Sequence, residues 1–192
     1  MSRLKSEEAV KDAVRMTAAM MAASARTAPK GRGVDAIETV IVDADDLEIL
    51  ASAMERKAQE GPSHLSSVFK RDANNVKNSS CVLLIGVVGL PKKVEEPLDC
   101  GACGYETCDR LLEAKREKQR AKDFGGPTCI FQALDLGIAL GSAAKLASEL
   151  NIDNRIMYTV GAAAKELRLL DCDVVIGIPL SVTGKSPYFD RR

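Results

Sequence analysis

Two long apolar segments constrain the fold of this chain more than any other feature. They are CVLLIGVVGL at residues 81–90 and DVVIGIPL at residues 173–180, and neither shows the polar–apolar alternation of a half-exposed strand. Continuous runs of aliphatic and β-branched residues of this length are typical of strands that are buried on both faces. A sheet with such strands needs helices on each side, so we expect a layered α/β fold.

Helical patterns of suitable length occur between the predicted strands. Asp43 is expected to cap a helix that ends at Gly61-Pro62, and His64 is expected to follow in a loop. The predicted helices are residues 6–25, 45–60, 109–124, 131–150 and 162–170, and the further predicted strands are residues 36–43 and 155–160. We therefore predict one domain over residues 1–192, of the mixed α+β type, with a central mixed sheet flanked by helices.

The charge balance argues against two large classes of partner. The chain has 27 Lys and Arg residues and 27 Asp and Glu residues, so its formal net charge is zero. Because there is no basic block, we expect no nucleic acid and no anionic membrane as a partner. The start of the chain is highly charged and the next apolar run is short, so we expect no signal peptide and no membrane span. We predict a cytoplasmic protein, whose thiols stay reduced.

Three of the six cysteines lie in one short stretch, DCGACGYETC, at residues 99–108. They are Cys100, Cys103 and Cys108, and Cys129 follows after a predicted charged helix, in GGPTCIF. The complete spacing is C-x2-C-x4-C-x20-C. Thiolates at such positions can converge if the loop is tight and the helix returns the fourth cysteine to it.

Glycine follows each of the first two cysteines, at Gly101 and Gly104. Glycine permits the backbone angles of a tight loop, and its exposed amide N–H groups can donate hydrogen bonds to sulfide and thiolate. A four-cysteine 4Fe-4S cluster accounts for all four cysteine positions together. The sequence therefore favours this cluster as the bound cofactor.

Other readings of the cysteines stay open. Structural zinc usually takes two close pairs of ligands, and a thioredoxin-type thiol pair needs a helix that starts at its first cysteine. A disulfide is disfavoured by the predicted compartment. Cys172, which could be a surface thiol, is the second choice for the fourth ligand after Cys129, whereas Cys81 opens a buried strand and is expected in the core.

The motif CGACGYETC followed by Cys129 resembles the small 4Fe-4S domain of corrinoid and electron-transfer proteins of anaerobes, whose pattern is CGxCGxxxC with a later fourth cysteine. The resemblance covers about residues 100–130 and implies an inserted ferredoxin-type segment at residues 98–130. Nearly end to end, the chain also resembles a family of uncharacterised prokaryotic ferredoxin-domain proteins. The stretches IVDADDLEILASAME, FKRDANNVKNSSCVLLIG and DLGIALGSAAKLASELNIDNRIMYTVGAAAKELRLLDCDVVIGIPLSVTGKSPYFDR carry that resemblance.

The order of elements outside the cysteine segment is similar to that of the flavin nitroreductases. An Ala-rich helix ends in AASARTAPKGRG, IETVIVDADDLEILASAM supplies a strand and a helix, and GIPL lies in the closing strand. The resemblance implies an FMN site, and it implies a homodimer. The residues that would contact the FMN phosphate are Arg26, Lys30, Arg32, Gly161, Lys185 and Arg191.

Two functions fit these features. The first is an iron–sulfur redox protein that transfers electrons, or has reductase-like activity, with a redox partner protein or a small electrophilic substrate. The second is a non-enzymatic binding or sensing module that is stabilised by iron–sulfur or zinc.

Overall fold

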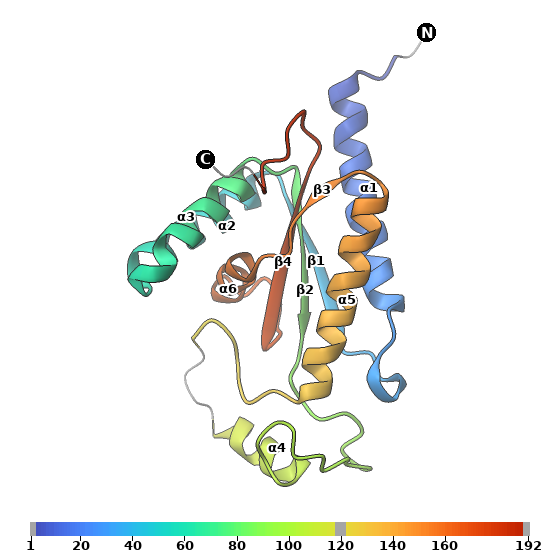
Figure 1. Cartoon of the computed structure of the whole chain (residues 1–192), viewed down its shortest axis with the longest axis vertical. Coiled ribbons are helices and arrows are strands. Elements are labelled where there is room, and N and C mark those ends of the chain that lie inside the picture. Colours follow the sequence, from blue (N-terminus) through green and yellow to red (C-terminus); the bar gives the residue numbers. More distant parts are fainter. Residues whose placement is uncertain (1–2, 118–121, 190–192) are drawn as a thin grey trace.

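The computed structural model describes residues 3–117 and 122–189, in which a sheet lies between two layers of helices (Figure 1). The helices are α1 (Ser6–Thr27), α2 (Asp45–Glu60), α3 (Ser63–Lys77), α4 (Cys108–Arg116), α5 (Ile130–Glu149) and α6 (Tyr158–Glu166). The strands are β1 (Ile37–Asp43), β2 (Cys81–Val87), β3 (Asp153–Asn154) and β4 (Val174–Ser181), and a short 3-10 turn, η1 (Gly31–Gly33), follows α1.

Strand β2 lies inside the sheet and contributes to both cores. The strand order is β1-β2-β4-β3, and all seven β2 residues are buried. Val82 and Leu84 belong to one hydrophobic cluster, and Leu83 and Ile85 belong to the other, as the twofold alternation of a strand requires. The prediction of a strand buried on both faces is confirmed. Every described pairing in the sheet is antiparallel, however, so the expectation of a mixed sheet is corrected.

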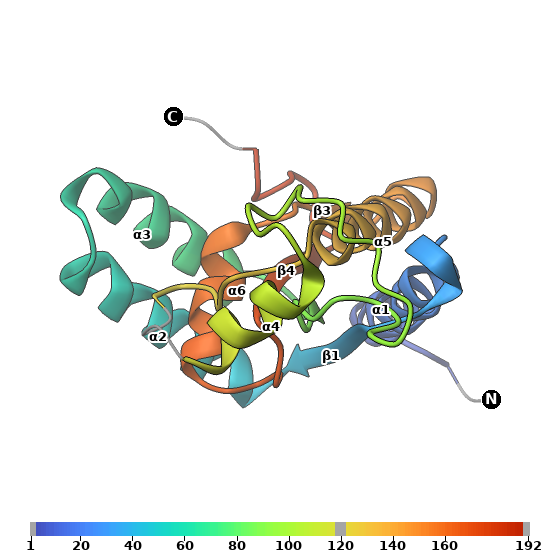
Figure 2. The ribbon, with the colours of Figure 1, turned by 90° about the horizontal axis from the view of Figure 1, so that it is seen from below.

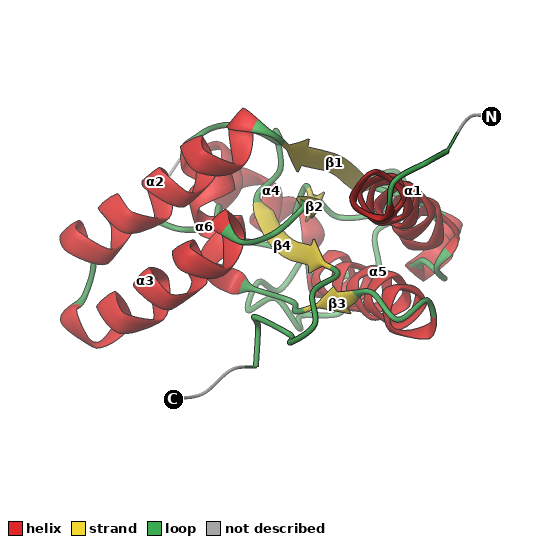
Figure 3. Ribbon diagram, turned by 90° about the horizontal axis from the view of Figure 1, so that it is seen from above, coloured by secondary structure: helices red, strands yellow, loops and turns green. Residues whose placement is uncertain are grey.

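The two helical layers cover opposite faces of the sheet (Figure 3). Helices α2, α3 and α6 pack on one face, around Met54 and Phe69. Helices α1 and α5 lie side by side on the other face, around Met21 and Ala139. The predicted α+β class with flanking helices is therefore confirmed. Helix α4 and the cysteine-containing loop lie beyond one end of the sheet (Figure 1).

Glycines allow α6 to approach β4 very closely. A methyl group at Gly161 would lie 1.7 Å from the carbonyl oxygen of Val175, and one at Gly177 would lie 2.2 Å from Cγ1 of Val160. Carbon and oxygen atoms cannot approach to such distances, so the helix would have to move away from the strand. Gly161 is thus required for the packing of α6 on the sheet.

We expect Gly161→Ala to lower the free energy of unfolding by about 1–3 kcal/mol, because it overpacks the α6–β4 contact. Gly137→Ala is the matched control, since Gly137 also lies in a helix but has open space where a methyl group would be. That control should instead raise the free energy by about 0.5–1 kcal/mol. Urea unfolding followed by circular dichroism measures both values. Equal effects of the two substitutions would contradict the close-packing argument.

Two segments differ from the sequence predictions. Helix α3 was not predicted, and His64 is an exposed residue in its first turn rather than in a loop. Residues 155–160 were expected to form a strand. Asp153–Asn154 pairs with β4, and Met157 forms a single antiparallel bridge with Gly177 of β4, but α6 begins at Tyr158. The β-branched residues of RIMYTV favour a strand locally. Packing of Val160 against Gly177 favours the helix, and this tertiary contact decides the outcome.

Helix boundaries also differ in two places. Asp43 ends β1 and does not cap α2; the N-cap is Ala44, with φ 51° and no side-chain hydrogen bond. The charged helix that was expected at residues 109–124 is described as α4 only over Cys108–Arg116. Part of that expectation falls on residues 118–121, which lie outside the described residues.

Helix α5 is long and apolar enough to cross a bilayer by length and composition alone. In this fold, however, it lies along α1 and contributes Leu136, Ala139, Leu140 and Ala143 to the core. Its N-terminal end lies near the cysteine-containing loop and α4 (Figure 1). The apolar composition of α5 therefore has a structural explanation in the core.

Candidate metal centre

The four predicted ligand cysteines line one pocket, which we call the cysteine pocket. Cys100, Cys103, Cys108 and Cys129 all contribute to it. Three of them come from the segment between β2 and the start of α4, and the fourth comes from the residue before α5. Figure 2 shows this segment and α4 at the end of the molecule, in front of the sheet. Cysteines from two distant segments thus line the same pocket, and their assignment as metal ligands stays a prediction.

The loop that carries the first three cysteines turns at its glycines. Gly101 has φ +69° and Gly104 has φ +88°, which are left-handed values that favour glycine. The amide N–H of Gly104 donates to the carbonyl oxygen of Gly101, at 3.0 Å, and closes a tight turn between Cys100 and Cys103. The glycines are therefore needed for the path of the loop around the pocket.

Two side chains fix the start of α4 at Cys108. The Asp99 carboxylate accepts a hydrogen bond from the backbone N–H of Cys108, at 2.7 Å. The Thr107 hydroxyl oxygen accepts from the N–H of Arg110, at 3.3 Å, as the N-cap of the helix. These bonds satisfy amide groups that a helix start otherwise leaves without partners. They hold Cys108 at a defined position in the pocket wall.

The fourth cysteine is fixed by the chain that leaves β2. The backbone N–H of Cys129 donates to the carbonyl oxygen of Gly89, at 2.9 Å. Thr128 packs so closely on Gly89 that a methyl group there would lie 2.7 Å from the Thr128 hydroxyl oxygen. The Gln132 amide donates to the carbonyl oxygen of Leu90, at 2.9 Å. Cys129 is 8% exposed and is the N-cap residue of α5.

Asp173 fastens the surroundings of the pocket to the sheet. Its carboxylate accepts a hydrogen bond from the N–H of Gly89 and pairs with the Lys115 ammonium of α4, both at 2.7 Å. Its backbone accepts from the N–H of Gly125, at 2.7 Å, and donates to the carbonyl of Val87, at 3.0 Å. Asp173, which directly precedes β4, thus joins that strand to β2, to α4 and to the segment that leads to Cys129.

The other two cysteines lie elsewhere. Cys81 is buried in β2, and burial is the main reason that the pKa of its thiol is raised to about 12. Cys172 is 3% exposed, so it is not the surface thiol that was one expectation from the sequence. Burial, followed by the negative charge of Glu38, raises the pKa of the Cys172 thiol to about 12. Cys172 lines a different pocket, next to Lys115 and Asp173.

The geometry bears on which metal group the cysteines could hold. Within residues 3–117 and 122–189, no three His, Cys, Asp or Glu side chains are close enough together to hold a single metal ion. One tetrahedral zinc needs sulfur atoms about 3.8 Å apart, because each Zn–S bond is about 2.3 Å long. In a 4Fe-4S cluster each thiolate binds a different iron, so the sulfurs stand farther apart. The described residues thus contain no preformed single-ion site, and four cysteines around one pocket are the number of protein ligands that a 4Fe-4S cluster takes.

The walls of the cysteine pocket are mostly apolar. Leu111 of α4 is 1% exposed, and Phe131 of α5 and Tyr105 of the loop also line the pocket. Apolar walls lower the local dielectric and strengthen the effect of any nearby charge on a bound group. A charge beside this pocket therefore affects a bound group more strongly than a charge at the solvent-exposed surface does.

One charged pair beside the pocket was not predicted from the sequence. Lys92 lines the pocket, and its ammonium pairs with the carboxylate of Asp135 in α5. The two side chains are 2% and 4% exposed. A single acidic residue within the apolar run FQALDLGIAL is the signal that could have indicated a buried partner, since isolated buried carboxylates are very costly.

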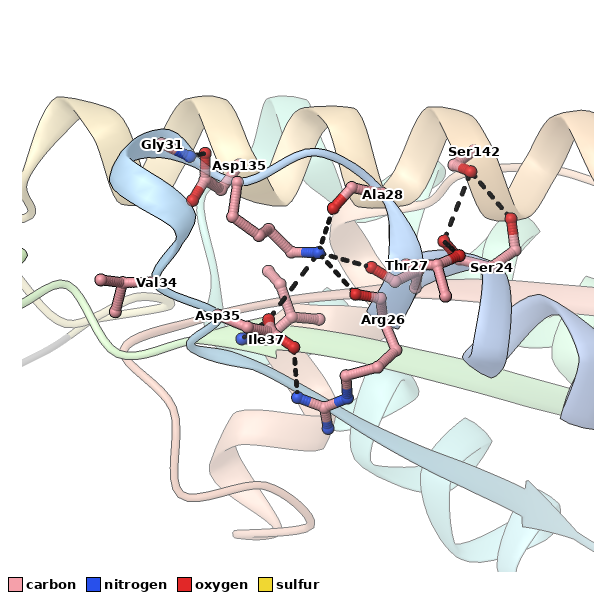
Figure 4. A network of polar contacts seen from close by, with 12 residues as sticks. Ser24, Arg26, Thr27, Ala28, Gly31, Val34, Asp35, Ile37, Asp135 and Ser142 are labelled. Atoms are coloured by element: carbon pink, nitrogen blue, oxygen red, sulfur yellow. Dashed lines mark hydrogen bonds and ion pairs between the residues drawn. The ribbon is translucent and has the colours of Figure 1, made fainter.

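The end of α1 and the turn that follows it contain three of the cations that were predicted to contact an FMN phosphate, with Arg26 in the last turn of the helix. Figure 4 shows how backbone carbonyls and the Asp35 carboxylate gather at this turn. The Lys30 ammonium donates to the carbonyl oxygens of Ala25, Arg26 and Ala28, at 2.9, 3.0 and 2.6 Å, and its side chain is 5% exposed. The Arg26 guanidinium donates to Asp35, at 2.8 Å. Both cations thus have partners within the protein.

The remaining predicted flavin contacts are dispersed. Arg32, which lies in η1 with φ 57°, donates to the carbonyl and the carboxylate of Glu96. Gly161 lies in α6, on the opposite face of the sheet from α1. The carbonyl of Lys185 accepts from the Thr183 hydroxyl, and Arg191 lies outside the described residues. The assignment of these residues to FMN stays a prediction, and the partners of Lys30 and Arg26 fit a phosphate site poorly.

The contacts of Asp35 shift its pKa and lead to a test of this turn. Burial acts to raise the pKa of the Asp35 carboxyl, but hydrogen bonds from Arg26 and from the Ile37 N–H, with the nearby Lys30 charge, lower it below the ordinary value of 3.8. A lowered pKa stabilises the folded protein above that ordinary value, and the contribution is lost as the pH falls through the folded value.

We therefore expect Asp35→Asn to lower the free energy of unfolding by about 1 kcal/mol at pH 7. The difference from the parent protein should be smaller at pH 3, because the pH is then below the ordinary pKa of 3.8 and the Asp35 carboxyl of the unfolded parent is protonated. Urea unfolding at both pH values measures it. A difference that is as large at pH 3 as at pH 7 would contradict the charged contacts described for Asp35.

Solved structures share the fold of this chain. A nitroreductase-like family protein from Bacillus cereus has a TM-score of 0.56 at 9% identity, over 100% of this chain and 93% of that one. A nitroreductase family protein from Clostridium novyi NT has a TM-score of 0.51 at 15% identity, over 92% and 77%. A structure described as an oxidoreductase containing FMN has a TM-score of 0.53 at 15% identity, over 96% and 70%. The fold is therefore nitroreductase-like, as the order of elements predicted.

Sequence comparison identifies the family. Residues 125–191 match the family described as "Uncharacterized protein containing a ferredoxin domain (DUF2148)". An archaeal relative from Archaeoglobus fulgidus is 48% identical over 180 residues, which is 94% of this chain and 92% of that protein. The chain belongs to this ferredoxin-domain family, as the quoted stretches indicated. The family match includes Cys129, whereas Cys100, Cys103 and Cys108 precede it.

Proposed function

We propose that this protein binds a 4Fe-4S cluster through Cys100, Cys103, Cys108 and Cys129 and transfers single electrons. The observation that carries the proposal is the meeting of these four cysteines, from two distant segments, around one pocket with apolar walls. Membership of a ferredoxin-domain family and the nitroreductase-like fold support redox activity. The bound cluster would supply one-electron chemistry near the surface of the protein.

The residues around the cysteines have defined parts in this proposal. The turns at Gly101 and Gly104 direct the loop around the pocket. Leu111 and Phe131 keep water from one side of the bound group. The bonds of Asp99 and Gly89 hold Cys108 and Cys129 in place before a cluster arrives. The fixed positions of these two cysteines reduce the ordering that binding must impose.

The other parts of the function are also proposals. The electron acceptor or donor would be a redox partner protein or a small electrophilic substrate, and the location would be the cytoplasm, where thiolate ligands stay reduced. FMN binding is supported by a fold that an FMN-containing oxidoreductase shares. It is opposed by the internal partners of Lys30 and Arg26, so we assign no step of the reaction to a flavin.

We also propose that two copies of the chain associate through α1 and α5. These neighbouring helices expose large apolar side chains, and Met16, Met20, Leu134 and Ile138 are each more than 40% exposed. Burial of such side chains between two copies would remove them from water. Mass measurement of the purified protein should give twice the chain mass of 20.6 kDa, and a monomer at all accessible concentrations would contradict this.

The cluster is tested by composition. Protein purified without air should be brown and should contain about four iron atoms and four sulfides per chain. Cys129→Ser should remove most of both, because it deletes one of four ligands. Cys81→Ala and Cys172→Ala are matched controls that delete buried thiols outside the cysteine pocket, and both should retain iron and sulfide.

Three outcomes would change the proposal. A colourless protein with one zinc per chain would support the zinc-stabilised module instead. Loss of iron from Cys172→Ala with retention of iron in Cys129→Ser would make Cys172 the fourth ligand in place of Cys129. A yellow, fluorescent solution after acid release would establish a flavin beside the cluster.

A further inference from the structure

A buried ion pair lies at the edge of the cysteine pocket. Lys92 follows β2 by a few residues, and Asp135 lies in the second turn of α5. The ammonium of Lys92 pairs with one oxygen of the Asp135 carboxylate and also donates to the carbonyl of Val34, at 2.6 Å. The other carboxylate oxygen accepts from the N–H of Gly31, at 2.9 Å. The two charges are thus held in fixed positions by backbone groups of the turn after α1.

The two charges are placed differently with respect to the pocket. Lys92 is among the residues that line it, together with Phe131, whereas Asp135 is not. Asp99, the other charged residue of the described lining, belongs to an exposed part of the loop. Lys92 therefore belongs to the wall of the pocket and Asp135 does not. The buried pair is connected to the pocket through Lys92, and both of its charges act there through a low dielectric.

Holding two segments together by a buried ion pair costs desolvation free energy. Removing two charges from water costs several kcal/mol each, and apolar residues of similar size often serve stability as well or better. The neighbouring contacts already fasten the same segments, since Gln132 binds the carbonyl of Leu90 and Arg32 binds Glu96. Anchoring alone therefore does not account for a charged pair at this position.

Reduction of a thiolate-bound cluster adds one negative charge inside the pocket. A nearby ammonium stabilises that charge, and the low dielectric of an apolar wall strengthens the effect. We propose that the Lys92–Asp135 pair sets the reduction potential of the bound cluster, with Lys92 raising it and Asp135 lowering it by partial compensation. This inference rests on the proposed function. The step is the uptake of one electron from an external reductant, with no proton transferred and no bond broken.

The test is an anaerobic redox titration of the purified holoprotein with dithionite, followed by absorbance and electron paramagnetic resonance. Lys92→Met should lower the midpoint potential. Asp135→Asn should leave it unchanged or raise it. The double variant K92M/D135N removes both charges, and its potential should lie below that of Asp135→Asn, because it also lacks the Lys92 charge. Lys145→Met is the control, since Lys145 is an exposed α5 residue that pairs with Glu149, and it should have no effect.

The direction of the shifts in midpoint potential distinguishes an electrostatic effect of the pair on the cluster from a purely structural role, in which the pair only anchors two segments. Anchoring alone predicts that Lys92→Met and Asp135→Asn lower the urea midpoint together and shift the potential in the same direction or not at all. Either result with intact cluster content overturns the inference. If Lys92→Met does not fold, the double variant decides, because it leaves no unpaired buried charge. Absence of iron and sulfide from the parent protein would refute the proposed function itself, and iron analysis distinguishes this case.

Discussion

The burial of β2 on both faces is the constraint on which the rest of this molecule depends. Its side chains alternate between two cores, so a helical layer must cover each side of the sheet. The chain has no Trp and only 4% aromatic residues, so these cores are filled by aliphatic side chains and alanine. Small side chains fill a core only if the layers come close together. Gly161 and Gly177 provide that approach between α6 and β4.

The same strand determines where the cysteine pocket lies. The chain that leaves β2 binds the start of α5 through the Gly89–Cys129 backbone bond and through Gln132. Asp173, which precedes β4, holds Gly89 and α4 together. The cysteine pocket at the end of the sheet is thus held in place by contacts with the buried strands. This arrangement separates a stable scaffold from the loop that carries the chemistry.

The sequence predicted the parts of this structure that depend on local pattern. Two buried strands, the flanking helices and the meeting of Cys129 with the cysteine loop all follow from apolar runs, spacing and glycine positions. Helix α3 was missed because its apolar residues are sparse. The helix predicted at residues 162–170 overlaps α6, but the first residues of α6, 158–160, were predicted as strand, and there the packing of Val160 outweighs β-propensity. The contact of Lys92 with Asp135 joins residues 43 positions apart, which no local pattern reveals.

The cysteine pocket combines two kinds of support. Cys129 belongs to the core, whereas Cys100 and Cys103 lie on a loop of turns and bends that has little regular structure. Stabilisation by a bound metal group acts on the segments that it joins, and the sheet does not need that help. If the proposed cluster binds there, its loss would release the loop and leave the buried scaffold folded.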